Sequence, residues 1–113
     1  MILHTVFCAL TPDHDPAELA AVMAGLEALE LDGFVGFAHG PNVDAEGKTP
    51  RYPYGFQCTF TDRAALDRYA QDAGHRALGA RLVAICEGGG EGVLVSDIDT
   101  DQAVGIATGG AAQ

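Results

Sequence analysis

The stretch Ile2-Leu-His-Thr-Val-Phe-Cys-Ala-Leu10, continued by Thr11-Pro-Asp-His-Asp-Pro-Ala-Glu18, decides the fold that we predict. Its first half is rich in Val, Phe, Leu and Cys, which predicts a strand. Its second half is a turn that ends in a helix start. Asp15 is the expected N-cap, Pro16 occupies the first helical position and Glu18 follows three residues after the cap. The chain therefore opens with a strand that leads directly into a helix.

The first helix continues as one apolar stripe and is predicted to end at Gly33. The residues of the stripe lie at helical spacing: Leu19, Val22, Met23, Leu26 and Leu29. A short second strand, Phe34 to His39, follows. The polar loop from Asn42 to Pro53 is long for a compact domain, so we expect it to line part of a surface or site.

The second half of the chain repeats the alternation. Tyr54 to Phe60 is predicted as the third strand, and Thr61 or Asp62 caps a second helical region. A glycine, Gly74, is expected to break that region into two segments. The last strand is Val93 to Ile98.

The predicted order is β-α-β-β-α-β, the order of a ferredoxin-like α+β sandwich. In this fold the helices cover one face of a four-stranded antiparallel sheet. Apolar residues occur on both faces of the predicted strands, and a sheet that is apolar on both faces is normally buried on both. We therefore predict a homodimer in which two sheets pack face to face as a dimeric α/β barrel.

Composition limits the partners. The 113 residues indicate one domain, predicted over residues 1–99, with a flexible Gly/Ala-rich tail at 100–113. The 16 acidic and six basic residues give a net charge of −10. This charge disfavours nucleic acid and anionic membranes as partners. No stretch approaches the ~20 apolar residues of a membrane span.

The cysteines and the N-terminus indicate a cytoplasmic protein. Cys8, Cys58 and Cys86 are odd in number, lie in apolar segments and form no C-x-x-C pair. They are interpreted as reduced, buried thiols. The N-terminal apolar run has no preceding basic residue and soon ends at Thr11-Pro12, so it is interpreted as a strand and not as a signal peptide.

An ordered set of short motifs resembles the stress-responsive dimeric α/β-barrel (Dabb) family over roughly residues 1–99. The motifs are Ile2 to Phe7, Gly40-Pro-Asn-Val43 with Glu46-Gly47, Tyr52 to Phe60 with Asp62-Arg-Ala-Ala-Leu66, and Tyr69 followed by His75-Arg-Ala-Leu78. The resemblance implies a homodimer with a cavity between sheet and helices in each subunit. It also implies no cofactor.

The family includes a polyketide cyclase in which a tyrosine and a histidine promote ring closure, and the matching positions here are Tyr69 and His75. His4 matches a histidine that lines the same cavity. Tyr54 stands where a further cavity histidine is found in the cyclase. Tyr54 and Phe56 are expected to be ligand-binding or interface walls.

His75 has three possible roles: a general base, a ligand-lining residue without chemistry, or a structural residue at the helix break. Tyr69 could donate a hydrogen bond to a carbonyl or form part of the core. His14 and His39 are interpreted as solvated. The cluster Asp13-His14-Asp15 lacks a spaced ligand set, so no metal site is predicted.

Two functions follow. The first is a homodimeric small-molecule-binding or stress-associated protein. The second is a cofactor-free enzyme, a polyketide-cyclase-like lyase or a monooxygenase, with His75 as base and Tyr69 as hydrogen-bond donor. In both, the expected ligand is a small apolar carbonyl or phenolic compound.

Overall fold

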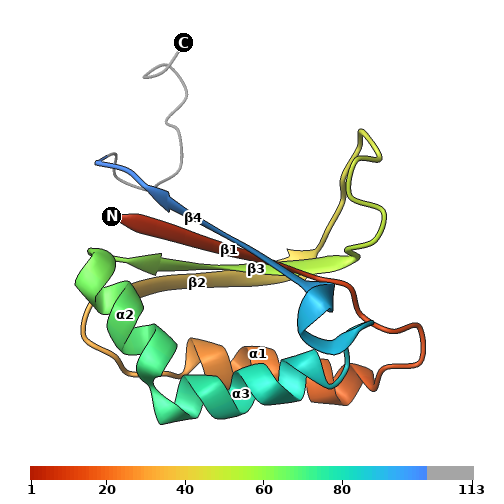
Figure 1. Ribbon diagram of the computed structural model, residues 1–113, viewed down its shortest axis with the longest axis horizontal. Coiled ribbons are helices and arrows are strands. Elements are labelled where there is room, and N and C mark those ends of the chain that lie inside the picture. Colours follow the sequence, from red (N-terminus) through yellow and green to blue (C-terminus); the bar gives the residue numbers. More distant parts are fainter. Residues whose placement is uncertain (102–113) are drawn as a thin grey trace.

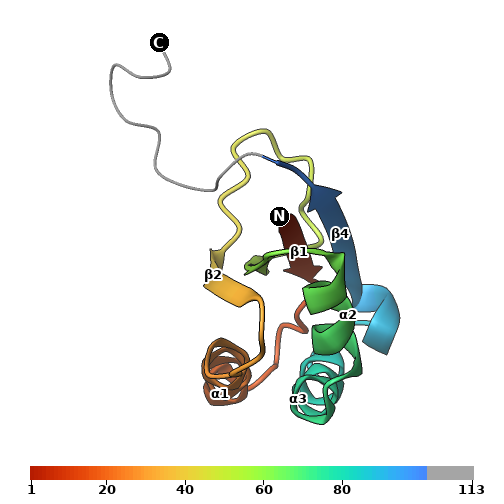
Figure 2. The same ribbon diagram turned by 90° about the vertical axis from the view of Figure 1, so that its left-hand side faces the viewer.

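The computed structural model describes residues 1–101, which form one sheet with helices on a single face (Figures 1 and 2). The elements are β1 (Ile2–Cys8), α1 (Pro16–Glu27), β2 (Phe34–Pro41), β3 (Tyr54–Phe60), α2 (Arg63–Gln71), α3 (Ala73–Val83), the 3₁₀ turn η1 (Gly89–Gly92) and β4 (Val93–Asp99). The strands pair antiparallel in the order β2-β3-β1-β4. The predicted ferredoxin-like α+β fold is confirmed.

The first helix begins as predicted and ends earlier than predicted. The Asp15 carboxylate accepts a hydrogen bond from the backbone N–H of Ala17 at 2.9 Å, and Pro16 opens α1. The helix ends at Glu27, so the prediction of an end at Gly33 is wrong. Gly33 instead has a φ of +84° in the turn that leads into β2, a conformation that glycine adopts without strain.

The break in the second helical region lies at Asp72 and not at Gly74. Asp72 is extended (φ −64°, ψ 130°) and ends α2. Its carboxylate accepts a hydrogen bond from the backbone N–H of His75 at 2.9 Å and so caps α3. Gly74 lies inside α3, because an aspartate that can satisfy a free helical N–H determines where the new helix begins.

The core lies between the helices and the inner face of the sheet. Alternate residues of each strand point toward the helices, as the register shows: Val6 of β1 lies opposite Phe56 of β3 and Val95 of β4. The buried core side chains come from every layer: Ile2, Val6, Cys8, Leu10, Leu19, Val22, Met23, Leu26, Phe56, Cys58, Phe60, Ala65, Tyr69, Leu82 and Cys86.

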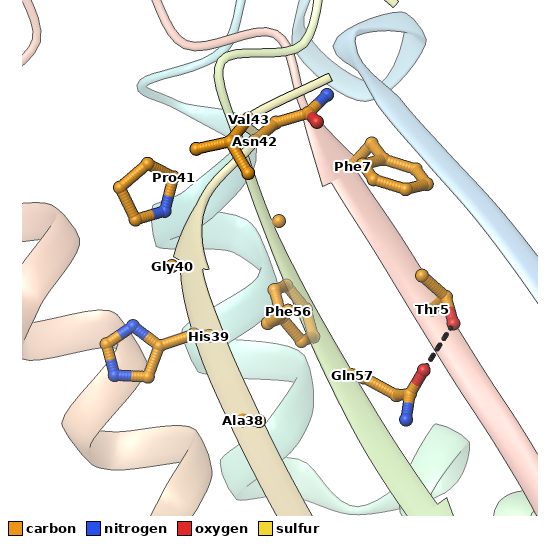
Figure 3. Close-up of a pocket in the computed structure, with 11 residues that line it drawn as sticks. Thr5, Phe7, Ala38, His39, Gly40, Pro41, Asn42, Val43, Phe56 and Gln57 are labelled. Carbon is orange, nitrogen blue, oxygen red and sulfur yellow. Dashed lines mark hydrogen bonds between the residues drawn. The ribbon is translucent and has the colours of Figure 1, made fainter. Parts of the chain in front are cut away.

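The outer face of the sheet is only partly apolar. Leu94 and Ile98 of β4 point outward and are 47% and 56% exposed. Beside them, the Thr5 hydroxyl donates to the side-chain oxygen of Gln57 at 3.1 Å (Figure 3). The outer face therefore carries the predicted apolar residues, but polar side chains interrupt them on β1 and β3.

The loop between β2 and β3 rises on the outer side of the sheet, away from the helices (Figures 1 and 2). The carboxylate of Asp44 organises it by accepting hydrogen bonds from the backbone N–H groups of Glu46, Lys48 and Thr49. Val43 at its base is 86% exposed. Val43, Phe7 and neighbouring outer-face residues line a hollow of about 360 Å³ (Figure 3).

The two ends of the described chain meet. The N-terminal amine of Met1 donates to the carbonyl of Thr100 at 2.9 Å, and the backbone N–H of Thr100 donates to the carbonyl of Met1 at 2.9 Å. Most of the predicted tail, residues 102–113, lies outside the described residues. Within residues 1–101, no helix has both the length and the apolar character that crossing a membrane requires.

Candidate functional site

A cavity of about 370 Å³ lies between the inner face of the sheet and the pair α2 and α3. This volume is in the range of small-molecule sites. Most of its wall is apolar, and its polar groups are two imidazoles, one phenol and two carboxylates. The lining residues are His4, Val6, Leu26, Phe56, Leu66, Asp67, Tyr69, Ala70, His75, Gly79, Leu82, Val83, Val93, Val95 and Asp97.

His75 enters the cavity from the first turn of α3, where the Asp72 cap fixes its backbone. Its ring lies 3.8 Å from the ring of Tyr69, centroid to centroid, with 33° between the planes. Its Nδ1 is buried and has no well-aligned hydrogen-bond partner among residues 1–101. Burial, and secondly the neighbouring His4, lower the pKa of His75, although nearby backbone carbonyls partly oppose this shift. The imidazole is therefore a neutral base at neutral pH.

Tyr69 forms the wall between the two imidazoles. Its side chain is 1% exposed, and its ring lies 4.9 Å from Phe60 and 5.6 Å from His4, centroid to centroid. The Cys58 thiol donates to its hydroxyl oxygen at 3.7 Å. Burial raises the pKa of Tyr69, so the phenol stays protonated. The ring shapes the cavity while the hydroxyl is directed to a core thiol.

His4 and Asp97 form a pair that sequence reasoning missed. They lie opposite each other in the register of β1 and β4, and Nδ1 of His4 is 2.6 Å from a carboxylate oxygen of Asp97. The His4 side chain is 12% exposed and that of Asp97 40%. The available signal was the alternation of β4, which puts Asp97 on the same inward face as Val93 and Val95.

The cavity brings together four of the five predicted site residues: His4, Phe56, Tyr69 and His75. The fifth, Tyr54, does not line it. Tyr54 pairs with Cys8 at the far end of β1, whereas His4 pairs with Cys58.

Tyr54 contacts His39. Of the two histidines predicted to be solvated, His39 is the exposed one. The hydroxyl of Tyr54 is 2.5 Å from Nδ1 of His39. His39 is also among the residues that line the outer-face hollow (Figure 3). The second, His14, is half-buried, and its Nδ1 is 2.7 Å from the carbonyl of Thr11.

The charged groups of the cavity are acidic. Asp67 from α2 and Asp97 from β4 line it, and no Lys or Arg does. Within residues 1–101 no group of three or more His, Cys, Asp or Glu is placed to hold a metal ion. The arrangement can hold an apolar molecule against its wall and present two imidazoles to a polar substituent.

Comparison with known proteins shows the family and the fold. Residues 2–100 match the family model of the stress responsive A/B barrel domain, Dabb, and the chain belongs to this family. A crystal structure of a dimeric ferredoxin-like protein of unknown function from Jannaschia sp. CCS1 is 44% identical to it, with a TM-score of 0.83. That match covers 88% of this chain and 98% of the other. A search among curated proteins found no match.

Two further solved structures share the fold. A Dabb family protein from Mesorhizobium loti is 26% identical, with a TM-score of 0.68, over 88% of this chain and 95% of that one. A hydroxynitrile lyase from Passiflora edulis is 12% identical, with a TM-score of 0.75, over 92% of this chain and 96% of that one. At that identity, the lyase shows the fold alone. Specific catalysis is not established by any of these likenesses.

Proposed function

We propose that this protein is a homodimer that binds a small, mostly apolar carbonyl or phenolic compound in the cavity beside His75. The observation that carries the proposal is the convergence of His4, Tyr69 and His75 on an apolar cavity of about 370 Å³. A mostly apolar pocket with a few convergent polar groups is the usual form of a ligand site. The family's name supports a stress-associated role for such a protein.

Gly79→Leu tests the ligand site. Gly79 lines the cavity, and a Cβ added there would meet nothing within 4 Å, so a larger side chain would fill the space. We expect wild-type protein to bind 2-naphthol or 2-acetonaphthone at up to millimolar concentration in ligand-observed NMR, and the variant to bind at least about tenfold more weakly. Its thermal midpoint should not fall, because replacing a helical glycine gains up to about 1 kcal/mol.

The matched control is Ala80→Leu, which adds the same side chain at the next, exposed position of α3. It should bind like wild type. If neither probe binds wild-type protein, or if both variants bind equally, the ligand site is wrong.

The dimer is supported by the outer face of the sheet. Leu94, Ile98 and Val43 leave apolar surface exposed there, and a 44%-identical relative is described as dimeric. We place the protein in the cytoplasm because its three cysteines are buried and unpaired.

A second candidate function is cofactor-free proton transfer, as in a polyketide-cyclase-like lyase or a monooxygenase. The observation that favours it is a neutral, half-buried His75 that shares one cavity with a second histidine, which is held by a carboxylate. His75 would accept a proton from the bound compound, and the ring of Tyr69 would form the wall against which that compound lies. A neutral imidazole needs no metal or cofactor for this step.

A further inference from the structure

We infer that the cavity selects neutral ligands that donate a hydrogen bond, so that its ligand class is a phenol and not a carbonyl compound. This inference rests on the proposed function, since it concerns the same cavity. It comes from counting which polar atoms of the cavity wall can donate and which can accept.

His4 presents an acceptor. A carboxylate only accepts hydrogen bonds, so the nitrogen 2.6 Å from Asp97, Nδ1, is the one that carries the proton in neutral His4. The other ring nitrogen, Nε2, then holds a lone pair. The pair therefore fixes the tautomer in which His4 accepts a proton or a hydrogen bond from a cavity occupant.

His75 presents a second acceptor. Its buried nitrogen is Nδ1, and the groups that approach its ring from α2 are the backbone carbonyls of Tyr69 and Ala70, which only accept. The proton of the neutral ring therefore belongs on Nδ1, toward the carbonyls. Nε2 is left as the nitrogen that can meet a ligand.

The remaining polar groups do not supply an accessible donor. The hydroxyl oxygen of Tyr69 accepts a hydrogen bond from the buried Cys58 thiol, and because the residue is only 1% exposed its own O–H lies in the core, away from a cavity occupant. Asp67 and Asp97 add acceptors and negative charge. Arg63, the first residue of α2, is paired with Asp99 at 2.8 Å and does not line the cavity.

A wall of acceptors discriminates in two ways. A carbonyl or ether oxygen would face lone pairs, so a bound acceptor would lose its hydrogen bonds to water without replacement. An anion would be repelled by the two carboxylates. A neutral phenol satisfies an imidazole with its O–H and buries its ring against the apolar wall.

Three naphthalene probes of similar size test the inference with the full chain at about pH 8, where imidazoles are ordinarily neutral. They are 2-naphthol, which donates, 2-methoxynaphthalene, which lacks the donor, and 2-acetonaphthone, which carries a carbonyl. We expect 2-naphthol to bind about tenfold more tightly than the other two, as measured by ligand-observed NMR titration.

Ring-preserving variants locate the acceptor. His4→Phe and His75→Phe should each weaken 2-naphthol binding about fivefold and leave 2-methoxynaphthalene binding within about twofold. His39→Phe, outside the cavity, should change neither. Thermal midpoints identify any variant that fails to fold, and the comparison of probes on wild-type protein holds without the variants.

The outcomes separate the two proposals. Equal affinity for the three probes, or tighter binding of 2-acetonaphthone, overturns the inference and leaves the binding function standing. Absence of binding by all three overturns the binding function as well.

Discussion

At the scale of single residues, the site depends on what each polar atom already contacts. His75 is half-buried, and its buried ring nitrogen is Nδ1, which leaves Nε2 to meet a cavity occupant, whereas the hydroxyl of the buried Tyr69 contacts Cys58. The first residue is thus available for chemistry, and the second contributes chiefly the face of its ring. His75 and Tyr69 therefore have different roles, whereas the sequence pattern paired them as base and hydrogen-bond donor.

Two substitutions test this difference. We expect His75→Ala to abolish any proton-transfer activity of the cavity while the protein stays folded, because a residue at a helix start contributes little to the core. Tyr69→Phe should lower that activity by no more than about threefold, and removal of the buried hydroxyl should cost about 1 kcal/mol of stability. The measurements are turnover and thermal midpoint. An equal loss of activity in both variants would show that the Tyr69 hydroxyl binds the reacting oxygen.

At the scale of elements, the break between α2 and α3 positions the base. Asp72 ends one helix and caps the next, so one carboxylate fixes both the helix boundary and the place of His75. Asp15, Asp62 and Asp72 are all aspartate N-caps, and of the pair Asp15 and Asp72 only Asp72 caps a helix turn that holds a cavity residue, His75.

We therefore expect Asp72→Ala and Asp15→Ala to lower stability by similar amounts, about 1 kcal/mol each, because each removes one capping hydrogen bond. Only Asp72→Ala should also weaken 2-naphthol binding, by about threefold or more. Chemical denaturation and NMR titration of both variants give the comparison. Unchanged binding in Asp72→Ala would mean that the cap has no part in placing His75.

The elements were largely predictable, and the site was predictable in part. Strands and the start of α1 follow from local signals such as Asp15-Pro16 and the apolar runs. The helix break was misplaced because Gly74 and Asp72 are both ordinary boundary residues, and only the carboxylate's contact with His75 decides between them. The pairing of Asp97 with His4 was not predicted because the two residues are 93 positions apart in the chain. Tyr54 was misassigned because strand register decides which end of the sheet it reaches.

At the scale of the whole molecule, one side of the sheet is covered by helices and the other carries apolar residues without cover. Packing two such faces together would bury the exposed Leu94 and Ile98. An interface of this kind is expected to bury on the order of 2,000 Å² or more in total.

We expect sedimentation at micromolar concentration to give the mass of a dimer, and the double variant Leu94→Glu/Ile98→Glu to give the mass of a monomer. The control Ala21→Glu/Ala24→Glu places the same added charge on the exposed side of α1 and should remain dimeric. A wild-type monomer, or a dimer that survives both pairs of substitutions, would show that this face is not the interface.

The mutual hydrogen bonds between Met1 and Thr100 make the folded chain nearly a closed ring. Because the two residues are neighbours, a short linker could join them, and new chain ends could be opened elsewhere without loss of packing. The chain could be reopened in the loop around Gly47, which projects from the sheet. The same closeness means that the domain could be spliced as a unit into a surface loop of a host protein, with entry and exit at one point.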